Sequence, residues 1–239
     1  MTQAAVTFQN CYYQIEDTKI LKNITGEVKA GKITTFIGPS GSGKTSLFRL
    51  INSLSSKTSG EIFINGIETN EIDPISLRKK VGIVFQEAIM MNGTVFDNLK
   101  LASELHNTEF TRGDALELLD KVGLENRFLD QLAKGLSSGQ KQKVSIARTL
   151  ANKPDILLLD EITASLDKVS AQDIEDLIAS LNKEEALTIL WITHNIEQAD
   201  KMGNDTWVLI DGEVAYRGPT EQINAAGDER VIRFIEGRH

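Results

Sequence analysis

The sequence predicts an α/β fold built on a mostly parallel β-sheet, with an antiparallel β subdomain and a helical subdomain attached to it. Three short, continuously apolar runs, at residues 33–37, 156–159 and 187–192, predict parallel strands that are covered on both faces. Other segments alternate apolar and polar residues, which is typical of antiparallel strands with one face in water. The stretch 95–151 carries apolar residues at helical spacing instead.

The antiparallel subdomain is expected from the first third of the chain. Residues 5–15, 20–29 and 60–67 alternate apolar and polar side chains. Turn residues stand at Ala30-Gly31 and Asn65-Gly66, so these segments are predicted to form strands and hairpins.

The helical subdomain is expected between the first and second apolar runs. Its helical spacing is shown by Ala115, Leu118, Leu119 and Val122. Further along, residues 169–181 predict an amphipathic helix, and residues 207–216 predict a hairpin that turns at Asp211-Gly212.

No internal repeat, low-complexity tract or linker divides the chain, so we expect a single domain over residues 1–239. Within it, residues 1–86 and 155–239 are predicted to form a catalytic core with the β subdomain. Residues 87–154 are predicted to form the helical subdomain.

Composition narrows the possible partners. The chain has 239 residues, 41% apolar content, a formal net charge of -8 and a pI near 5.0, which argues against a nucleic-acid binder that depends on a basic face. The single cysteine, Cys11, forms no internal disulfide and suits a reducing compartment. The N-terminus lacks a signal peptide, and no stretch approaches the roughly 20 apolar residues of a membrane span. We therefore expect a cytoplasmic protein whose membrane role, if it has one, requires a partner.

A phosphate-binding loop directly follows the first apolar run. The pattern G-x-x-x-x-G-K-[ST] is matched by Gly38, Pro39, Ser40, Gly41, Ser42, Gly43, Lys44 and Thr45. In such a loop the backbone N–H groups wrap a phosphate chain, the lysine supplies a charge to the outer phosphates and the Thr45 hydroxyl ligates Mg²⁺. A helical run at 46–54 follows, as the motif requires, so the core is predicted to be that of a P-loop NTPase.

Two acids end the second apolar run. Asp160 is placed to hold Mg²⁺, and Glu161 is placed to polarise an attacking water as a general base. Taken alone, such acids more often form a solvated turn. Together with the phosphate loop they predict phosphoryl transfer, because that reaction needs both a metal site and an oriented nucleophile.

Two further polar residues stand where strands are predicted to end. His194 follows the third apolar run, where it is expected to contact the terminal phosphate and hold the geometry of water and glutamate. Gln86 follows the apolar residues 81–85, and its amide is expected either to ligate Mg²⁺ or to contact the water. For Gln86 a plain loop position remains an equal alternative.

These motifs, in this order, resemble the ATP-binding subunit of ATP-binding-cassette (ABC) transporters. They are GPSGSGKT, Gln86, LSSGQ at 136–140, ILLLDE at 156–161, the Ser-Leu-Asp run at 165–167 and His194. The resemblance covers essentially the entire chain. The LSSGQ signature between a glutamine loop and an acid-ended strand is its specific element.

The resemblance implies ATP and Mg²⁺ as ligands and a second ATP-binding subunit as partner. In this family the signature turn closes over the γ-phosphate held by the phosphate loop of the other subunit, in a head-to-tail dimer. Carried over here, Ser137, Gly139 and Gln140 of one copy complete the site of a second copy, and Asp167 joins the two sites. Because both half-sites are intact, a homodimer is expected.

Three positions depart from the family pattern. Ser138 replaces a glycine of the signature, and Ile162 stands where many members carry proline. The family also stacks an aromatic ring on adenine, for which Tyr13 is the candidate beside Tyr12, whereas a different register places Ile15 there. For the tyrosines, packing across the strands is an equal alternative.

The resemblance also implies an integral membrane permease as a partner. The segment 86–96 follows the pattern of the surface that receives a short permease helix, and it contains the apolar residues Ile89, Met90, Met91 and Phe96. A small core under a loop is the alternative reading. Docking there places the protein on the inner face of the cell membrane.

The expected function is therefore ATP-driven transport through a separate permease, by nucleotide-dependent closure of the dimer. The alternative is a soluble cassette ATPase of DNA repair, chromosome structure or translation. It is disfavoured because the stretch 45–135 shows no sustained heptads and the chain holds one cassette. A module that binds but does not hydrolyse nucleotide is disfavoured by the presence of Glu161 and His194.

Overall fold

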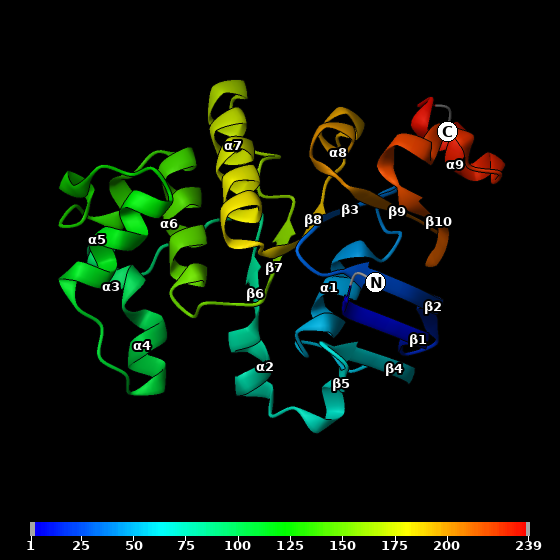
Figure 1. The fold of residues 1–239 in the computed structure, drawn as a ribbon, viewed down its shortest axis with the longest axis horizontal. Helices are drawn as coiled ribbons and strands as arrows, with labels where there is room; N and C mark the ends of the chain where they lie inside the picture. Colours follow the sequence, from blue (N-terminus) through cyan, green and yellow to red (C-terminus); the bar gives the residue numbers. More distant parts are fainter. Residues whose placement is uncertain (1–2, 238–239) are drawn as a thin grey trace.

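The central feature of the fold is a six-stranded sheet, which lies between the helical and the antiparallel regions in Figure 1. The computed structural model describes residues 3–237, apart from the side chain of His106. The strand order is β10-β9-β3-β8-β7-β6, and all neighbours are parallel except β10 and β9. The strands are β3 (Ile33–Ile37), β6 (Val81–Val84), β7 (Ile156–Asp160), β8 (Thr188–Ile192), β9 (Asp205–Ile210) and β10 (Glu213–Pro219). The predicted α/β fold with a mostly parallel sheet is confirmed.

A second, antiparallel sheet has the strand order β2-β1-β4-β5. Its strands are β1 (Ala4–Ile15), β2 (Thr18–Lys29), β4 (Ser59–Ile64) and β5 (Ile67–Glu68). Asn65-Gly66 forms the β4–β5 turn with φ values of 49° and 83°, as two-residue hairpin turns require. The β1–β2 hairpin turns at Glu16-Asp17, with Glu16 at a φ of 52°, and Ala30-Gly31 instead leads into β3.

Helices cover both sides of the six-stranded sheet and form a separate group beside it (Figure 1). That group contains α3 (Val95–Leu99), α4 (Leu101–His106), α5 (Arg112–Lys121) and α6 (Ser138–Leu150), with the 3-10 turns Asn126–Phe128 and Ala133–Gly135. The others are α1 (Lys44–Ile51), α2 (Pro74–Lys80), α7 (Lys168–Glu185), α8 (Ile196–Met202) and α9 (Glu229–Ile235), with the 3-10 turns Thr69–Glu71 and Thr220–Ala225. Over the described residues, no helix combines the length and the apolar character that crossing a bilayer requires.

Alternate residues of the central strands supply two apolar cores. On β7, Leu157 and Leu159 belong to a core shared with α6 and α7, whereas Ile156 and Leu158 belong to a core shared with α1 and the antiparallel sheet. All four side chains are fully buried. Burial of each such side chain stabilises the fold by about 1.5–3 kcal/mol. The apolar run of β7 is continuous because both faces of the strand are buried.

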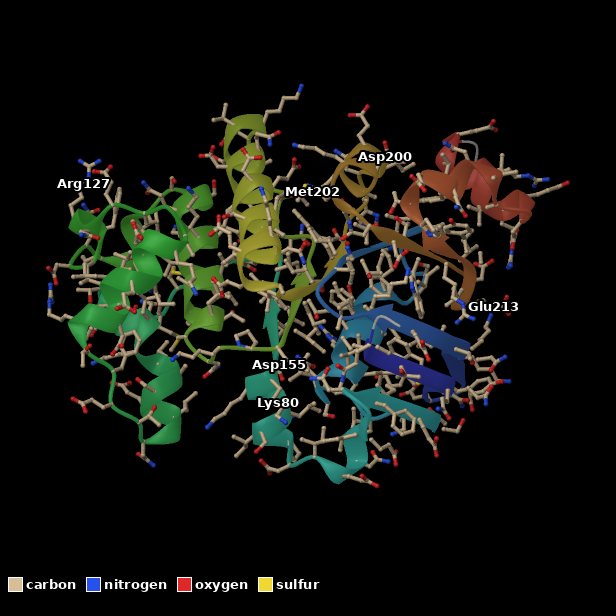
Figure 2. All side chains as sticks on the ribbon, viewed as in Figure 1. Lys80, Arg127, Asp155, Asp200, Met202 and Glu213 are labelled. Atoms are coloured by element: carbon tan, nitrogen blue, oxygen red, sulfur yellow. The ribbon has the colours of Figure 1, made fainter. Side chains whose placement is uncertain are left out.

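Strand register brings the carboxyl ends of three parallel strands to one edge. Asp160 of β7 pairs with Ile192 of β8, and Ile192 pairs with Phe36 of β3. At the opposite edge the Asp155 N–H donates to the Lys80 carbonyl at 2.9 Å, and Figure 2 shows these two residues close together. The loops that follow β3, β7 and β8 therefore begin side by side.

Leu158→Ala should lower the free energy of unfolding by about 2–5 kcal/mol, because it removes a fully buried side chain and leaves a cavity between the sheet and α1. Chemical denaturation followed by circular dichroism measures the change. The matched control is Leu105→Ala on α4, where the side chain is 80% exposed, and it should shift the free energy by less than about 0.5 kcal/mol. Equal effects at both positions would contradict this account of the core.

Candidate functional site

The phosphate loop, Gly38–Thr45, connects β3 to α1 and folds around its own lysine. The Lys44 ammonium donates to the carbonyl of Gly38 at 2.8 Å, to that of Pro39 at 2.9 Å and to the Ser42 hydroxyl at 3.4 Å. Lys44 is only 5% exposed. Burial lowers its pKa, and the nearby carboxylates of Glu161 and Asp160 oppose that shift.

The base of this loop is fixed, whereas its tip is open. A side chain at Gly38 would meet the Leu209 carbonyl of β9, so only glycine lets the loop lie so close to the sheet. At the tip, Ser40 and Gly41 are exposed, and space is open beside Gly41. A rigid base with an open tip of small residues is a fitting cradle for a phosphate chain.

Two hard oxygen ligands meet where the loop enters α1. The Thr45 hydroxyl donates to Asp160 Oδ1 at 3.2 Å, and Asp160, the last residue of β7, is 8% exposed. Burial raises the pKa of the Asp160 carboxyl, and the Thr45 hydrogen bond offsets part of that shift. No cluster of three or more His, Cys, Asp or Glu side chains that could hold a metal occurs in the described chain. The donor set fits Mg²⁺, which takes few protein oxygens and fills its remaining positions with phosphate and water.

Glu161 and His194 are in direct contact. Glu161 Oε1 lies 2.7 Å from His194 Nε2, and the side chains are 19% and 45% exposed. Glu161 adopts a left-handed backbone with a φ of 53°, and its N–H donates to the Ile192 carbonyl at 3.1 Å. A non-glycine residue with positive φ is uncommon, and here it turns the chain away from the line of β7 and ties it to β8. The histidine orients a carboxylate that faces partly into solvent.

The LSSGQ segment forms the start of α6. Ser137 caps the helix, and its side chain and that of Gln140 each accept the other residue's backbone N–H, at 3.3 and 3.0 Å. A side chain at Gly139 would lie 3.0 Å from the Ser170 hydroxyl on α7. Ser170 in turn donates to Asp167, which caps α7.

The signature and its own phosphate loop remain separate. In the described chain, no hydrogen bond or ion pair joins residues 137–140 to residues 38–45. Ser137 and Ser138 are exposed, as is Asp167. The structure therefore brings together Lys44, Thr45, Asp160, Glu161 and His194, and leaves the signature facing solvent on the same chain.

Gln86 follows β6 and is exposed, and none of the hydrogen bonds found in the described chain involves its side chain. Its loop is held by two residues of α6 that the sequence analysis did not single out. Gln142 donates to the Phe85 carbonyl at 3.2 Å, and Arg148 donates to the Ile89 carbonyl at 3.1 Å. A long-range bond from one helix to one backbone carbonyl leaves no periodic signal in a sequence.

The candidate for adenine contact lies on β1. Tyr13 is half-buried and packs against the core beneath the antiparallel sheet, beside Leu21 of β2, with which it pairs. Tyr12 and Ile15 are exposed. Leu21 also lies under Gly43 of the phosphate loop, so this part of the sheet borders the cradle.

The fold and this constellation define a P-loop nucleotide hydrolase: a phosphate loop between strand and helix, a hydroxyl and a carboxylate that fit Mg²⁺, and a histidine-bound glutamate on one sheet edge. The family model described as ABC transporter matches residues 21–164. The chain belongs to the ABC transporter family, as an ATP-binding and ATP-hydrolysing subunit.

Two relatives with ATP-binding roles in their names support this assignment. A putative ABC transporter ATP-binding protein, YjkB of Bacillus subtilis, is 40% identical over 219 residues, which are 91% of this chain and 87% of that protein. The methionine import ATP-binding protein MetN of Helicobacter pylori is 39% identical over 223 residues, which are 91% of this chain and 68% of that protein. These relatives support a transporter subunit and not the soluble alternative.

Solved structures agree as well. CbiO1 of Clostridium perfringens, described as part of the transporter complex cbiONQ, superposes with a TM-score of 0.85 at 28% identity, covering 99% of this chain and 96% of that one. A dimeric ATP-binding cassette in a post-hydrolysis state, bound to ADP and phosphate, superposes with a TM-score of 0.79 at 34% identity, covering 90% and 98%.

Asp160→Asn should stabilise the nucleotide-free protein at pH 7 and abolish ATP hydrolysis. Burial raises the pKa of Asp160, so its carboxyl ionises less readily in the folded state than in the unfolded chain. Above the ordinary aspartate pKa, this difference lowers the free energy of unfolding, and the loss grows as pH rises toward the raised pKa. The gain in melting temperature should therefore be present at pH 7 and should shrink toward pH 4.

The control for this pH dependence is Asp200→Asn, at an exposed position on α8 that is labelled in Figure 2. It should leave the melting temperature nearly unchanged at both pH values. A lower melting temperature of Asp160→Asn at pH 7 would contradict the prediction.

Proposed function

We propose that two copies of this chain clasp ATP and Mg²⁺ between them and that the resulting closure drives solute through a separate membrane permease. The observation that carries the proposal is the Glu161–His194 pair beside the Thr45–Asp160 pair, at the edge where the phosphate loop begins. The division into a core of residues 1–86 and 155–239 and a helical subdomain of residues 87–154 is part of this proposal.

The phosphate loop binds the phosphate chain of ATP. Its N–H groups and Lys44 face the phosphates, and the Lys44 ammonium exchanges its loop carbonyls for phosphate oxygens. Thr45 and Asp160 hold Mg²⁺, with Gln86 as a further ligand. The bound ion neutralises charge that develops on the phosphates. Tyr13 contributes to the adenine contact.

Glu161 acts as the general base toward the attacking water, and His194 keeps its carboxylate in place. The short contact between them fixes one carboxylate oxygen and leaves the other free for water. The partial exposure of both residues leaves room for the terminal phosphate and for the water.

The second half of each site comes from the other copy. Ser137, Gly139 and Gln140 lie at the start of α6, where the helix dipole favours an anion, and Ser137 is exposed there. Asp167 accepts a hydrogen bond from Ser170, and in the proposed dimer it contacts the partner copy. A dimeric relative bound to ADP and phosphate supports this head-to-tail homodimer.

The permease docks on the segment 86–96. Ile89 and Met91 are 63% and 52% exposed there, and Met90 and Val95 turn inward to the core that α6 shares. Two exposed apolar residues on a loop that buried neighbours hold in place form an adaptable docking surface. A permease partner places the chain at the inner face of the membrane. The charge of -8 supports a role without nucleic acid.

Glu161→Gln should reduce ATP turnover by at least about 100-fold while ATP still binds, because the amide keeps the shape of the side chain and cannot accept a proton. Size-exclusion chromatography should then show a dimer that depends on ATP. The same change at Glu221, an exposed residue of a distant 3-10 turn, is the control and should leave turnover unchanged. Normal turnover in Glu161→Gln would remove Glu161 as the base.

Two inactive variants should restore activity when they are mixed. Lys44→Ala removes the phosphate loop's charge, and Ser137→Arg obstructs the signature, so each homodimer has no intact site. In a mixed dimer, one site combines an unchanged phosphate loop with an unchanged signature, and ATPase activity should reappear. A double variant carrying both changes, mixed with either single variant, is the control and should stay inactive. Absence of recovery in the mixture would argue against the head-to-tail arrangement.

A further inference from the structure

A polar cleft between α7 and α8 opens directly beside the catalytic pair. Its lining includes Glu161 and His194 together with Glu175, Gln198 and Lys201. None of the last three residues belongs to one of the sequence motifs described above. They join the loop after β7 to the helix after β8.

Gln198 is at the centre of this cleft. It is the third residue of α8, it is 6% exposed, and its backbone N–H is capped by Asn195. Its side-chain amide donates to Thr163 Oγ1 at 3.0 Å and to Glu175 Oε1 at 2.7 Å. One buried side chain therefore contacts the loop 161–167, the helix α7 and its own helix α8.

The orientation of the Gln198 amide is fixed by Glu175. A carboxylate only accepts hydrogen bonds, so the amide nitrogen must face Glu175. The same nitrogen reaches Thr163 Oγ1 at 3.0 Å, and the amide oxygen lies 3.4 Å from that hydroxyl. Lys201 donates to the other oxygen of Glu175 at 2.7 Å, which holds the carboxylate in turn. A hydrogen-bond network holds its side chains in place when every member is satisfied.

The catalytic pair needs such a support. Thr163 lies two residues after Glu161, and α8 begins two residues after His194. The His194 side chain is 45% exposed, and exposed pairs contribute little to holding two chain segments together. The bond between Thr163 and Gln198 joins the same two segments at a partly buried position, where both residues are less exposed than His194.

We propose that Gln198, held by Glu175, is a positioning residue that sets the separation of the Glu161 loop from the His194 loop. In this role it acts through Thr163 and not on the reacting atoms. Its effect is on the rate of hydrolysis and not on the binding of ATP, because the phosphate loop makes no bond to it. The proposal rests on the proposed role of Glu161 as the general base.

The first test replaces Gln198 by glutamate. Gln198→Glu keeps the size of the side chain, removes both donors and sets a second carboxylate against Glu175, so kcat should fall about tenfold or more through misplacement of the pair. KM for ATP should stay within about twofold, because phosphate-loop contacts are unchanged. Gln222→Glu is the matched control, since it makes the same change at an exposed glutamine of the 3-10 turn Thr220–Ala225, which does not line the cleft. It should leave kcat unchanged.

The second test reverses the network. In Gln198→Glu combined with Glu175→Gln, the new amide at 175 donates to the new carboxylate at 198, and the Thr163 hydroxyl donates to its other oxygen. This double variant should recover most of the lost kcat. Two substitutions at Thr163 test the hydroxyl itself. Thr163→Val removes the hydroxyl and should lower kcat, whereas Thr163→Ser keeps the hydroxyl and should retain kcat.

Melting temperature and ATP-dependent dimerisation are measured alongside kcat. Unchanged kcat in Gln198→Glu and Thr163→Val would overturn the proposal, as would a loss of kcat that only follows the folded fraction and is not recovered in the double variant. If Glu161→Gln keeps full turnover, the proposed function itself has failed. If Glu161→Gln is inactive while Gln198→Glu is fully active, only the role of Gln198 has failed.

Discussion

The candidate site depends on the register of three parallel strands. The pairing of Asp160 with Ile192, and of Ile192 with Phe36, fixes where β7, β8 and β3 end relative to one another. Burial on both faces enforces this register, because a slip by one residue would exchange the side chains of the two apolar cores. The phosphate loop, the acids and His194 are far apart in the sequence, and they become neighbours because each begins at a strand end that hydrophobic packing has already placed. The chemistry of the site thus rests on apolar residues that never touch a ligand.

A single helix, α6, connects the other functional segments. Its first turn is the signature, which packs closely on Ser170 next to Asp167, and its later turns hold the loop after β6 through Gln142 and Arg148. The proposed permease surface and the proposed partner-facing signature are therefore two ends of one rigid rod. The helix α6 is continuous over 13 residues and buries one face in the core, so we expect a displacement at one end to move the helix as a body.

Much of this arrangement is predictable from the sequence, and the reasons are physical. Continuous apolar runs identified β3, β7 and β8, and the glycine-rich pattern identified the phosphate loop, because burial and backbone geometry restrict those residues locally. The hairpin turn at Glu16 was missed because neither glycine nor asparagine marks it. The helix after the phosphate loop begins at Lys44 and not at residue 46, since Gly43 adopts a left-handed conformation immediately before it. The bonds of Gln142 and Gln198 leave no mark in the sequence, because they join segments 23 or more residues apart and only the tertiary fold defines them.

The hydrogen bonds between the phosphate loop and its own lysine have a consequence for the ATPase cycle. The carbonyls of Gly38 and Pro39 accept hydrogen bonds from the Lys44 ammonium, so the lysine has partners within its own loop. An arriving nucleotide replaces bonds that already exist, and only the difference between the two sets contributes to affinity. The same difference is all that must be overcome for spent nucleotide to depart. Because the loop itself supplies these acceptors, the lysine keeps hydrogen-bond partners from one nucleotide to the next, which suits a site that turns over repeatedly.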